Sequence, residues 1–466
     1  MEKNYNFQNL SGVEEILTPE IFSSLAEERN YAEIKSLAER LPAPDLAELF
    51  AAIPDSSHVL LFRLLSKEHA AETFVEMDSD DRRRLIDSFT DKELSDILSE
   101  LYIDDTVDLI EEMPAIVVKR ILRNSAREDR ESINRILNYP KDSAGSVMTT
   151  EYVRFTADMT VEAALKHIRR VAIDKETIYT CYVTDKNRCL IGIVTAKQLL
   201  LSEPDVLLSD IMDEDVIFVH TNDDKEEVAL KLDKYGFLAM PVTDSERRLV
   251  GIVTVDDAIE VLKEESEEDF AKMAAITPSE TPYLKTSVFS IWKSRIPWLL
   301  LLMVSATFSS TILSGFEAAL PAVLILFVPM LMDTGGNSGG QSSVTVTRGI
   351  SLMEVGFSDL PRVFFKEVRV GIMCGVTLGA VAFGKVMLID RLIMQNDAVT
   401  LYVALAVSLA LTVTVIVAKI IGATLPILAK KIGFDPAVMA SPLITTVVDA
   451  ISLVLYFFIA SAIMNL

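Results

Sequence analysis

The stretch PLITTVVDAISLVLYFF, residues 442–458, decides the class of fold because it places one acidic residue inside an apolar run. An α-helix rises about 1.5 Å per residue, so about 20 residues cross a hydrocarbon core about 30 Å thick. Within the apolar segment 438–464, Asp449 would lie near the middle of the bilayer. An uncompensated carboxylate at that depth costs several kcal/mol, so such a residue indicates an ion pathway.

Polar side chains near Asp449 share one helical face. Ser441, Thr445 and Asp449 follow one another at intervals of four residues, and Thr446 lies three residues before Asp449, which aligns them along a helix. We predict that these side chains line a pore. The alternative is an ion pair between Asp449 and Lys419, the only base well inside a span. Lys419 lies near one end of its span and can reach the interface, so its depth does not match that of Asp449.

Five apolar stretches are long enough to cross a membrane: 297–316, 319–346, 367–389, 400–425 and 438–464. A buried helix bundle in a soluble enzyme is a weak alternative. Lys385 and Arg391 fall at one set of helix ends, against eight basic residues at the other: Lys293, Arg295, Arg348, Arg362, Lys366, Arg369, Lys430 and Lys431. The positive-inside rule places this second set in the cytosol. We expect a multi-pass protein of the cell (inner) membrane, with cytoplasmic N-terminal domains and the C-terminus outside.

The second span carries the polar sequence PMLMDTGGNSGGQSS, residues 329–343. Such permissive backbone is tolerated at membrane depth only where it is buried or lines water. Asp333, Gly336 and Asn337 are therefore predicted to line the pore. The alternative is close helix packing through small residues, which we prefer for Gly371, Gly375 and Gly379 in the third span.

The sparse set of ligands indicates which ion passes. One carboxylate with hydroxyls and carbonyls cannot remove all the water from a divalent cation. Magnesium dehydrates reluctantly and keeps several waters, so a wide polar site suits it. The stripe has no thiolate or imidazole, which disfavours zinc and copper. A pore for other divalent cations, such as Co²⁺ or Mn²⁺, is the first alternative.

Nearly all the excess negative charge lies in the first part of the chain. Residues 1–286 hold 59 of the 68 acidic residues and 33 of the 44 basic ones. This balance argues against nucleic acid as a partner, because phosphate backbones require a basic face. An acidic face concentrates cations, although it also simply confers solubility.

Residues 1–137 are expected to form an acidic helical domain. The segments DLAELFAAIP (45–54) and DTVDLIEEMP (105–114) resemble each other, which favours a superhelix of stacked helices. Asp104, Asp105 and Asp108 cluster at the start of one helix. They are candidates for cation binding, and helix capping is the alternative.

An internal duplication follows. YVTDKNRCLIGIVTAKQLL (182–200) matches PVTDSERRLVGIVTVDDAI (241–259), and each copy resembles the cystathionine-β-synthase (CBS) module. The modules span 138–202 and 203–262 and imply an α/β pair. Thr254 and Asp257 match the family's nucleotide position, which implies ATP at this copy, whereas the other copy has Lys197 and Gln198. The alternative is a structural pair that binds no nucleotide.

A connecting helix, assigned to the segment 263–290, joins this pair to the membrane spans. Its acidic residues fall on shared faces within 256–273, among them Glu260, Glu264 and Glu268. Like charges four residues apart repel, and divalent cations bound between this helix and another acidic surface would remove that cost. A solvated acidic linker is the alternative.

Together these parts resemble the MgtE magnesium transporter family over nearly the whole chain, most specifically in PMLMDTGGNSGGQ and FDPAVMASPLITTVVDA. The resemblance implies a homodimer with the pore on its two-fold axis and Asp449 as the pore aspartate. It also implies regulatory magnesium ligands: Asp104, Asp108, Asp224, Glu226, Asp257, Glu260, Glu265, Glu268, Asp269 and Asp435. The sequence departs from the family pattern at Gly236, Asp333, Ser441 and Thr445.

The resemblance implies inward Mg²⁺ flux that is closed by cytosolic Mg²⁺. Bound ions would hold the acidic faces together, and their loss would let repulsion open the pore. A membrane-anchored CBS nucleotide sensor is the alternative from another class. An enzyme is not expected, because the 4 histidines are scattered through the N-terminal part.

Overall fold

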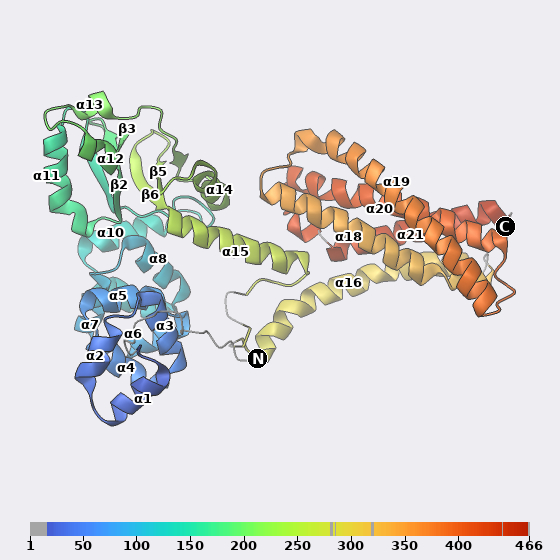
Figure 1. Ribbon diagram of the computed structural model, residues 1–466, viewed down its shortest axis with the longest axis horizontal. Helices are drawn as coiled ribbons and strands as arrows, with labels where there is room; N and C mark the ends of the chain where they lie inside the picture. The colour runs from blue at the N-terminus through green and yellow to red at the C-terminus, as the bar shows by residue number, and fades with distance from the viewer. Residues whose placement is uncertain (1–15, 280–282, 285, 318–320, 440, 465–466) are drawn as a thin grey trace. The chain divides into compact units, whose positions relative to one another are not determined.

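The computed structural model describes residues 16–279, 283–284, 286–317, 321–439 and 441–464. The chain divides into two compact units, Met1–Leu262 and Lys263–Leu466. Figure 1 shows both units, coloured along the chain.

Ten short helices begin the first unit. They are α1 (Pro19–Glu27), α2 (Tyr31–Ala38), α3 (Ala43–Ala52), α4 (Asp55–Leu64), α5 (Lys67–Val75), α6 (Ser79–Ser88), α7 (Asp91–Leu98), α8 (Ile103–Glu112), α9 (Ala115–Asn124) and α10 (Arg127–Ile136). Most of them pack mainly on the helix two places along the chain, as in α3 on α5 and α5 on α7, whereas α1 packs on α2. The rings of Phe50, Phe62, Phe74 and Phe89 form a continuous buried row across these helices. This arrangement confirms the predicted helical N-domain.

Two small sheets with the same topology follow. The first contains β1 (Tyr152–Thr156), β2 (Thr177–Thr184) and β3 (Leu190–Thr195), and the second contains β4 (Val219–His220), β5 (Ala239–Thr243) and β6 (Leu249–Thr254). In both, the first pair of strands is parallel and the second antiparallel. The accompanying helices are α11 (Val161–Val171), α12 (Ala196–Leu201), α13 (Leu208–Ile211) and α14 (Lys225–Tyr235).

The duplication extends to the turns. Arg188 and Arg247 occupy equivalent hairpin positions, with φ of 68° and 62°. The Leu190 N–H donates to the Arg247 carbonyl and the Leu249 N–H to the Arg188 carbonyl, each over 3.0 Å. This reciprocal pairing joins the two copies and confirms the CBS pair. The last helix, α15 (Val255–Met273), continues from β6 across the division between the units.

Five long helices dominate the second unit (Figure 1). They are α16 (Val288–Glu317), α18 (Val328–Ser351), α19 (Leu360–Lys385), α20 (Leu401–Lys431) and α21 (Ser441–Met464), with the short α17 (Ala322–Ile325) before α18. A π-helical segment, Val386–Ile393, extends α19. The fold confirms the predicted five-helix bundle, although the expected second span, 319–346, is divided between α17 and α18.

Four segments of the described chain are long and apolar enough to cross a membrane: Val288–Phe316, Phe357–Ile393, Leu401–Lys431 and Ala437–Met464. Helix α18 is not among them, because its sequence is too polar. It packs instead against α20 and α21 inside the bundle. A polar helix at membrane depth is stable only where other protein or water covers it.

Glycines allow these helices to approach closely. A Cβ atom added to Gly375 of α19 would lie 2.7 Å from the Thr412 carbonyl oxygen of α20, and one added to Gly422 of α20 would overlap the backbone of Gly339 in α18. The glycines of α19 therefore have the packing role that the sequence suggested. The glycines of α18 share it.

Candidate functional site

The side of α18 that faces away from the bundle is polar. Asp333, Asn337 and Gln341 are exposed, while Gly335 and Gly339 on the opposite face are buried. The other long helices expose apolar side chains, as expected for lipid contact, among them Leu301, Val376 and Leu409. Helix α18 thus reverses the pattern of its neighbours, so its outer face requires water or another polar surface.

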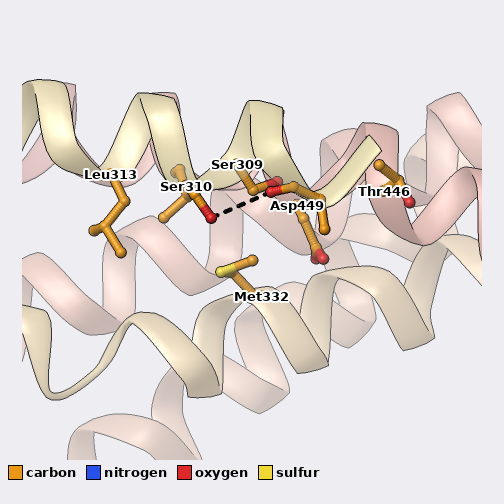
Figure 2. A pocket seen from close by; sticks show the side chains of 8 residues that line it. Ser309, Ser310, Leu313, Met332, Thr446 and Asp449 are labelled. Atoms are coloured by element: carbon orange, nitrogen blue, oxygen red, sulfur yellow. Dashed lines mark hydrogen bonds between the residues drawn. The ribbon is translucent and has the colours of Figure 1, made fainter. Parts of the chain in front are cut away.

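Asp449 borders a cavity of about 240 Å³ between three helices. Ser309 and Ser310 of α16, Met332 of α18 and Thr446 of α21 line it with Asp449, as Figure 2 shows. The Asp449 Oδ1 atom is buried and has no hydrogen-bond partner in the described part of the chain. Buried polar atoms normally have a partner, so this oxygen is suited to water or a hydrated cation.

The structure redistributes the roles expected around Asp449. Thr445 packs against α18, where a Cβ atom added to Gly336 would lie 2.7 Å from the Thr445 methyl carbon. Thr446, which belongs to the same predicted polar stripe, lines the cavity. The side chain of Ser441 lies outside the described residues.

Ser309 and Ser310 were not predicted from the sequence. Their only sequence signal is a pair of small polar residues within an otherwise apolar span, ATFSSTILSG. In many apolar helices a serine hydroxyl donates a hydrogen bond to a backbone carbonyl of its own helix, and Ser310 does donate to the Ala306 carbonyl, 3.3 Å away. The sequence pattern alone therefore does not show whether these serines line a cavity. Their role follows only once α18 and α21 are placed beside α16.

Lys419 does not pair with Asp449. Its Nζ atom donates to Ser342 Oγ over 3.4 Å, and this hydroxyl donates to Glu367 Oε2 over 2.7 Å. The Lys419 side chain is buried. The lysine therefore joins α18, α19 and α20 through a polar network that is separate from the Asp449 cavity, which argues against the ion-pair alternative.

A cluster of carboxylates lies within the first unit. Burial, together with the charge of Asp257, raises the pKa of Asp104 well above its ordinary value and raises that of Asp105 to about 7. Neighbouring protein displaces water from Asp108 and raises its pKa to about 7 as well, although this side chain keeps an exposed edge. Glu260 adds to this effect on Asp108. The predicted ligands of α8 and α15 are thus electrostatically coupled.

Two further glutamates belong to this cluster and were not predicted. Burial raises the pKa of Glu176 to about 8, and its Oε2 atom is buried without a hydrogen-bond partner among the described residues. Glu151 accepts the Ile103 N–H of α8 over 3.0 Å. Both glutamates flank strands and lie outside any recognisable motif, so only the folded chain brings them to α8.

The cluster is not a preformed ligand shell. The described chain contains no group of three or more His, Cys, Asp or Glu side chains placed to hold a metal ion. Magnesium commonly binds through one or two carboxylates and several waters. A hydrated ion therefore suits these carboxylates better than a closed cage.

Other residues predicted at the regulatory and nucleotide sites have visible structural contacts. Asp224 caps α14 by accepting the Glu226 N–H over 2.8 Å. Gly236 ends that helix with φ of 65°, a left-handed conformation that favours glycine. Asp257 accepts a hydrogen bond from the Thr254 hydroxyl, so the same carboxylate serves both the acidic cluster and the expected nucleotide position.

At the far end of α15 a lysine occupies the centre of the predicted ligand set. Lys272 Nζ lies 2.6 Å from Asp435 Oδ2 and 2.7 Å from Glu268 Oε1. Asp269, one turn after the half-buried Glu265, accepts a hydrogen bond from Ser351 Oγ over 2.8 Å. Burial raises the pKa of Asp269. The ammonium group thus already compensates two of these carboxylates.

Family models match three parts of the chain. A divalent cation transporter domain matches residues 328–459, the MgtE intracellular N domain matches residues 17–142, and CBS domains match residues 144–203 and 208–264. The matched transporter domain contains α18, Asp449 and the residues of α18 and α21 that line the cavity, whereas the residues that α16 contributes lie before the match. The fold and site therefore define a membrane transporter of divalent cations.

Curated relatives extend this match. The magnesium transporter MgtE of Thermus thermophilus is 34% identical over 435 residues, 92% of this chain and 94% of the relative. That of Bacillus subtilis is 32% identical over 436 residues, 92% of this chain and 94% of the relative. The chain belongs to the MgtE family.

Solved structures resemble the N-terminal half. The soluble part of a magnesium transporter is 31% identical with a TM-score of 0.50, and covers 53% of this chain and 97% of its own. The cytosolic domain of the Mg²⁺ channel MgtE in complex with ATP is 32% identical with a TM-score of 0.49, and covers 51% of this chain and 98% of its own.

Proposed function

We propose that the chain conducts Mg²⁺ into the cell along the polar face of α18, past Asp449 of α21. The observation that carries this proposal is the reversed polarity of α18, with Asp333, Asn337 and Gln341 exposed in a unit whose other long helices expose apolar residues. The buried Oδ1 of Asp449, which has no hydrogen-bond partner among the residues that the structure describes, supports the same path. Both features require water or a cation at membrane depth.

Asp449 would hold the ion through its water shell. Thr446, Ser309 and Ser310 bring hydroxyl oxygens to the same cavity, and water bridges can join such oxygens to a hydrated ion. A second copy of the chain would cover the polar face of α18 and bring another Asp449 to the path. We therefore propose a homodimer in the cell (inner) membrane, with the first unit cytoplasmic and the C-terminus outside.

Cytosolic Mg²⁺ would close this path through the acidic residues of the first unit and α15. Burial is the main cause that raises the pKa values of Asp104, Asp105, Asp108 and Asp257, and the charges of neighbouring carboxylates raise them further. In the absence of a cation these carboxylates therefore repel one another. A dication bound among them would offset that repulsion and favour the compact arrangement. At low Mg²⁺ the repulsion returns and favours an open state.

The deciding experiment is Mg²⁺ flux into liposomes that contain wild type or Asp449→Asn, with low internal Mg²⁺. We expect the variant to lose flux by at least about a hundredfold, because an amide cannot compensate the dication. Asp397→Asn, on an exposed segment between α19 and α20, serves as the matched control. Equal flux through all three proteins would exclude this path, provided that each protein elutes as wild type does.

Competition uptake experiments distinguish Mg²⁺ transport from the alternative functions. Co²⁺ or Mn²⁺ that passes while Mg²⁺ does not would assign the pore to another divalent cation. ATP binding at Thr254 and Asp257 is a separate proposal, supported by the CBS pair and tested by nucleotide titration of Asp257→Asn. Nucleotide binding without flux of any divalent cation would instead favour a membrane-anchored sensor.

A further inference from the structure

A second cavity, of about 300 Å³, lies in the membrane unit away from Asp449. It is formed by the end of α18, the segment 352–357 that follows it, and the end of α20. Ile350 and Ile427, each 2% exposed, line it together with Val355 and Phe357. Lys430 and Lys431 line it as well. The cavity therefore combines a mostly apolar lining with two positive charges.

The two lysines are available to an anion. Both side chains are exposed, and neither forms an ion pair with a carboxylate within the described residues. Lys431 Nζ lies 3.6 Å from the centre of the Phe357 ring, a cation–π contact that leaves ammonium hydrogens free. Two adjacent ammonium groups beside an apolar cavity match an anion that carries a hydrocarbon part.

The surrounding surface favours a lipid over a free anion. Met353, Phe357, Ile432 and Phe434 are 51%, 45%, 71% and 60% exposed around the cavity. Lys430 and Lys431 belong to the basic set that the positive-inside rule places at the cytosolic face. Exposed apolar side chains with lysines at one depth are typical of the headgroup boundary, where basic pockets between helices bind anionic lipids.

We propose that this cavity binds one anionic phospholipid of the cytosolic leaflet. The lipid phosphate contacts Lys430 and Lys431, and the start of an acyl chain packs above Ile350 and Ile427. A zwitterionic lipid fits less well, because its own ammonium group meets two like charges. The bound lipid holds the ends of α18 and α20 together on the side away from the Asp449 cavity.

The test uses the full chain in detergent and phosphatidylglycerol as the probe, with retained lipid counted by native mass spectrometry. We expect Lys430→Gln/Lys431→Gln to weaken phosphatidylglycerol binding at least about tenfold, because each of the two lysines contributes electrostatic attraction to the binding free energy of the anionic lipid. Lys430→Arg/Lys431→Arg should bind as wild type does. Lys366→Gln/Arg369→Gln on α19 is the matched control, since both residues are exposed basic groups outside the cavity.

Three results would overturn the proposal. Equal loss in the α19 control would indicate general charge attraction, and unchanged binding in the double glutamine variant would exclude the cavity. Displacement of the lipid by inorganic phosphate at matched concentration would indicate a free-anion site. Because flux is not the readout, these outcomes are independent of the proposed ion path.

Discussion

Helices α18 and α19 have similar glycine spacings, but the residues on the face opposite the glycines differ in polarity. Both use glycines to approach α20, at Gly339 and Gly375 respectively. Helix α19 turns apolar residues outward, with Met373 72% exposed, whereas α18 turns Asn337 outward. The glycines are therefore a packing device in both helices, and the residues on the other face distinguish a pore lining from a lipid contact.

The largest expected effect tests the feature that α18 and α19 share, which is close packing through glycine. Gly375→Val places a Cβ atom 2.7 Å from the Thr412 carbonyl oxygen, so we expect a loss of about 3 kcal/mol of stability from overpacking. Gly384→Val is the control, because a Cβ atom there meets nothing within 4 Å. Unfolding of the purified variants measures the difference. Equal stability of the two variants would contradict the packing role.

Substitutions of exposed residues test the feature in which α18 and α19 differ, which is the polarity of the face opposite the glycines. Asn337→Leu should leave the fold intact and reduce Mg²⁺ flux about tenfold, which corresponds to about 1.4 kcal/mol of barrier. Met373→Asn should keep flux per folded molecule and lower stability, because it places an amide against lipid. Liposome flux and unfolding are measured on both variants. The comparison fails if both substitutions affect the same property.

Regulation by the carboxylate cluster predicts a pH dependence. The pKa of Asp105 is raised to about 7, from about 4 in an unfolded chain, so the folded state binds the extra proton between these values. Without divalent cations, stability therefore falls as pH rises from about 4 to 7. Mg²⁺ competes with that proton, so Mg²⁺ inhibition of flux should be about tenfold more sensitive at pH 8 than at pH 6. Asp105→Asn should reduce this dependence. An unchanged pH profile in that variant would show that another group causes the pH dependence of Mg²⁺ inhibition.

The smallest expected effect concerns the other end of α15. Lys272→Met removes the ammonium group that lies 2.6 Å from Asp435 and 2.7 Å from Glu268. We expect flux at low internal Mg²⁺ to rise by a factor of about two to five, because such partly exposed pairs contribute about 1 kcal/mol or less. Mg²⁺ should still inhibit, since it can compensate the same carboxylates. Lys263→Met on the exposed side of α15 is the control. An equal rise in flux in that variant would show that Lys272 has no specific role.

Much of the architecture could be predicted because local patterns determine it. Repeated segments indicated the CBS pair, apolar lengths indicated the membrane helices, and position within the last span set the depth of Asp449. The site was predicted less completely. Of the two threonines in the predicted polar stripe, Thr446 lines the cavity whereas Thr445 packs against α18. Adjacent helical residues differ by about 100°, and the sequence does not fix which neighbour each face meets.

The sequence by itself determined that a carboxylate lies at membrane depth in a chain with an acidic N-terminal part. Only the tertiary structure decided which groups meet these charges. It joined Lys419 to Ser342 rather than Asp449, added Glu151 and Glu176 to the carboxylates of α8, and placed Lys272 between Glu268 and Asp435. The physical reason is that depth and periodicity follow from local backbone geometry, whereas electrostatic partners come from elements far apart in the chain.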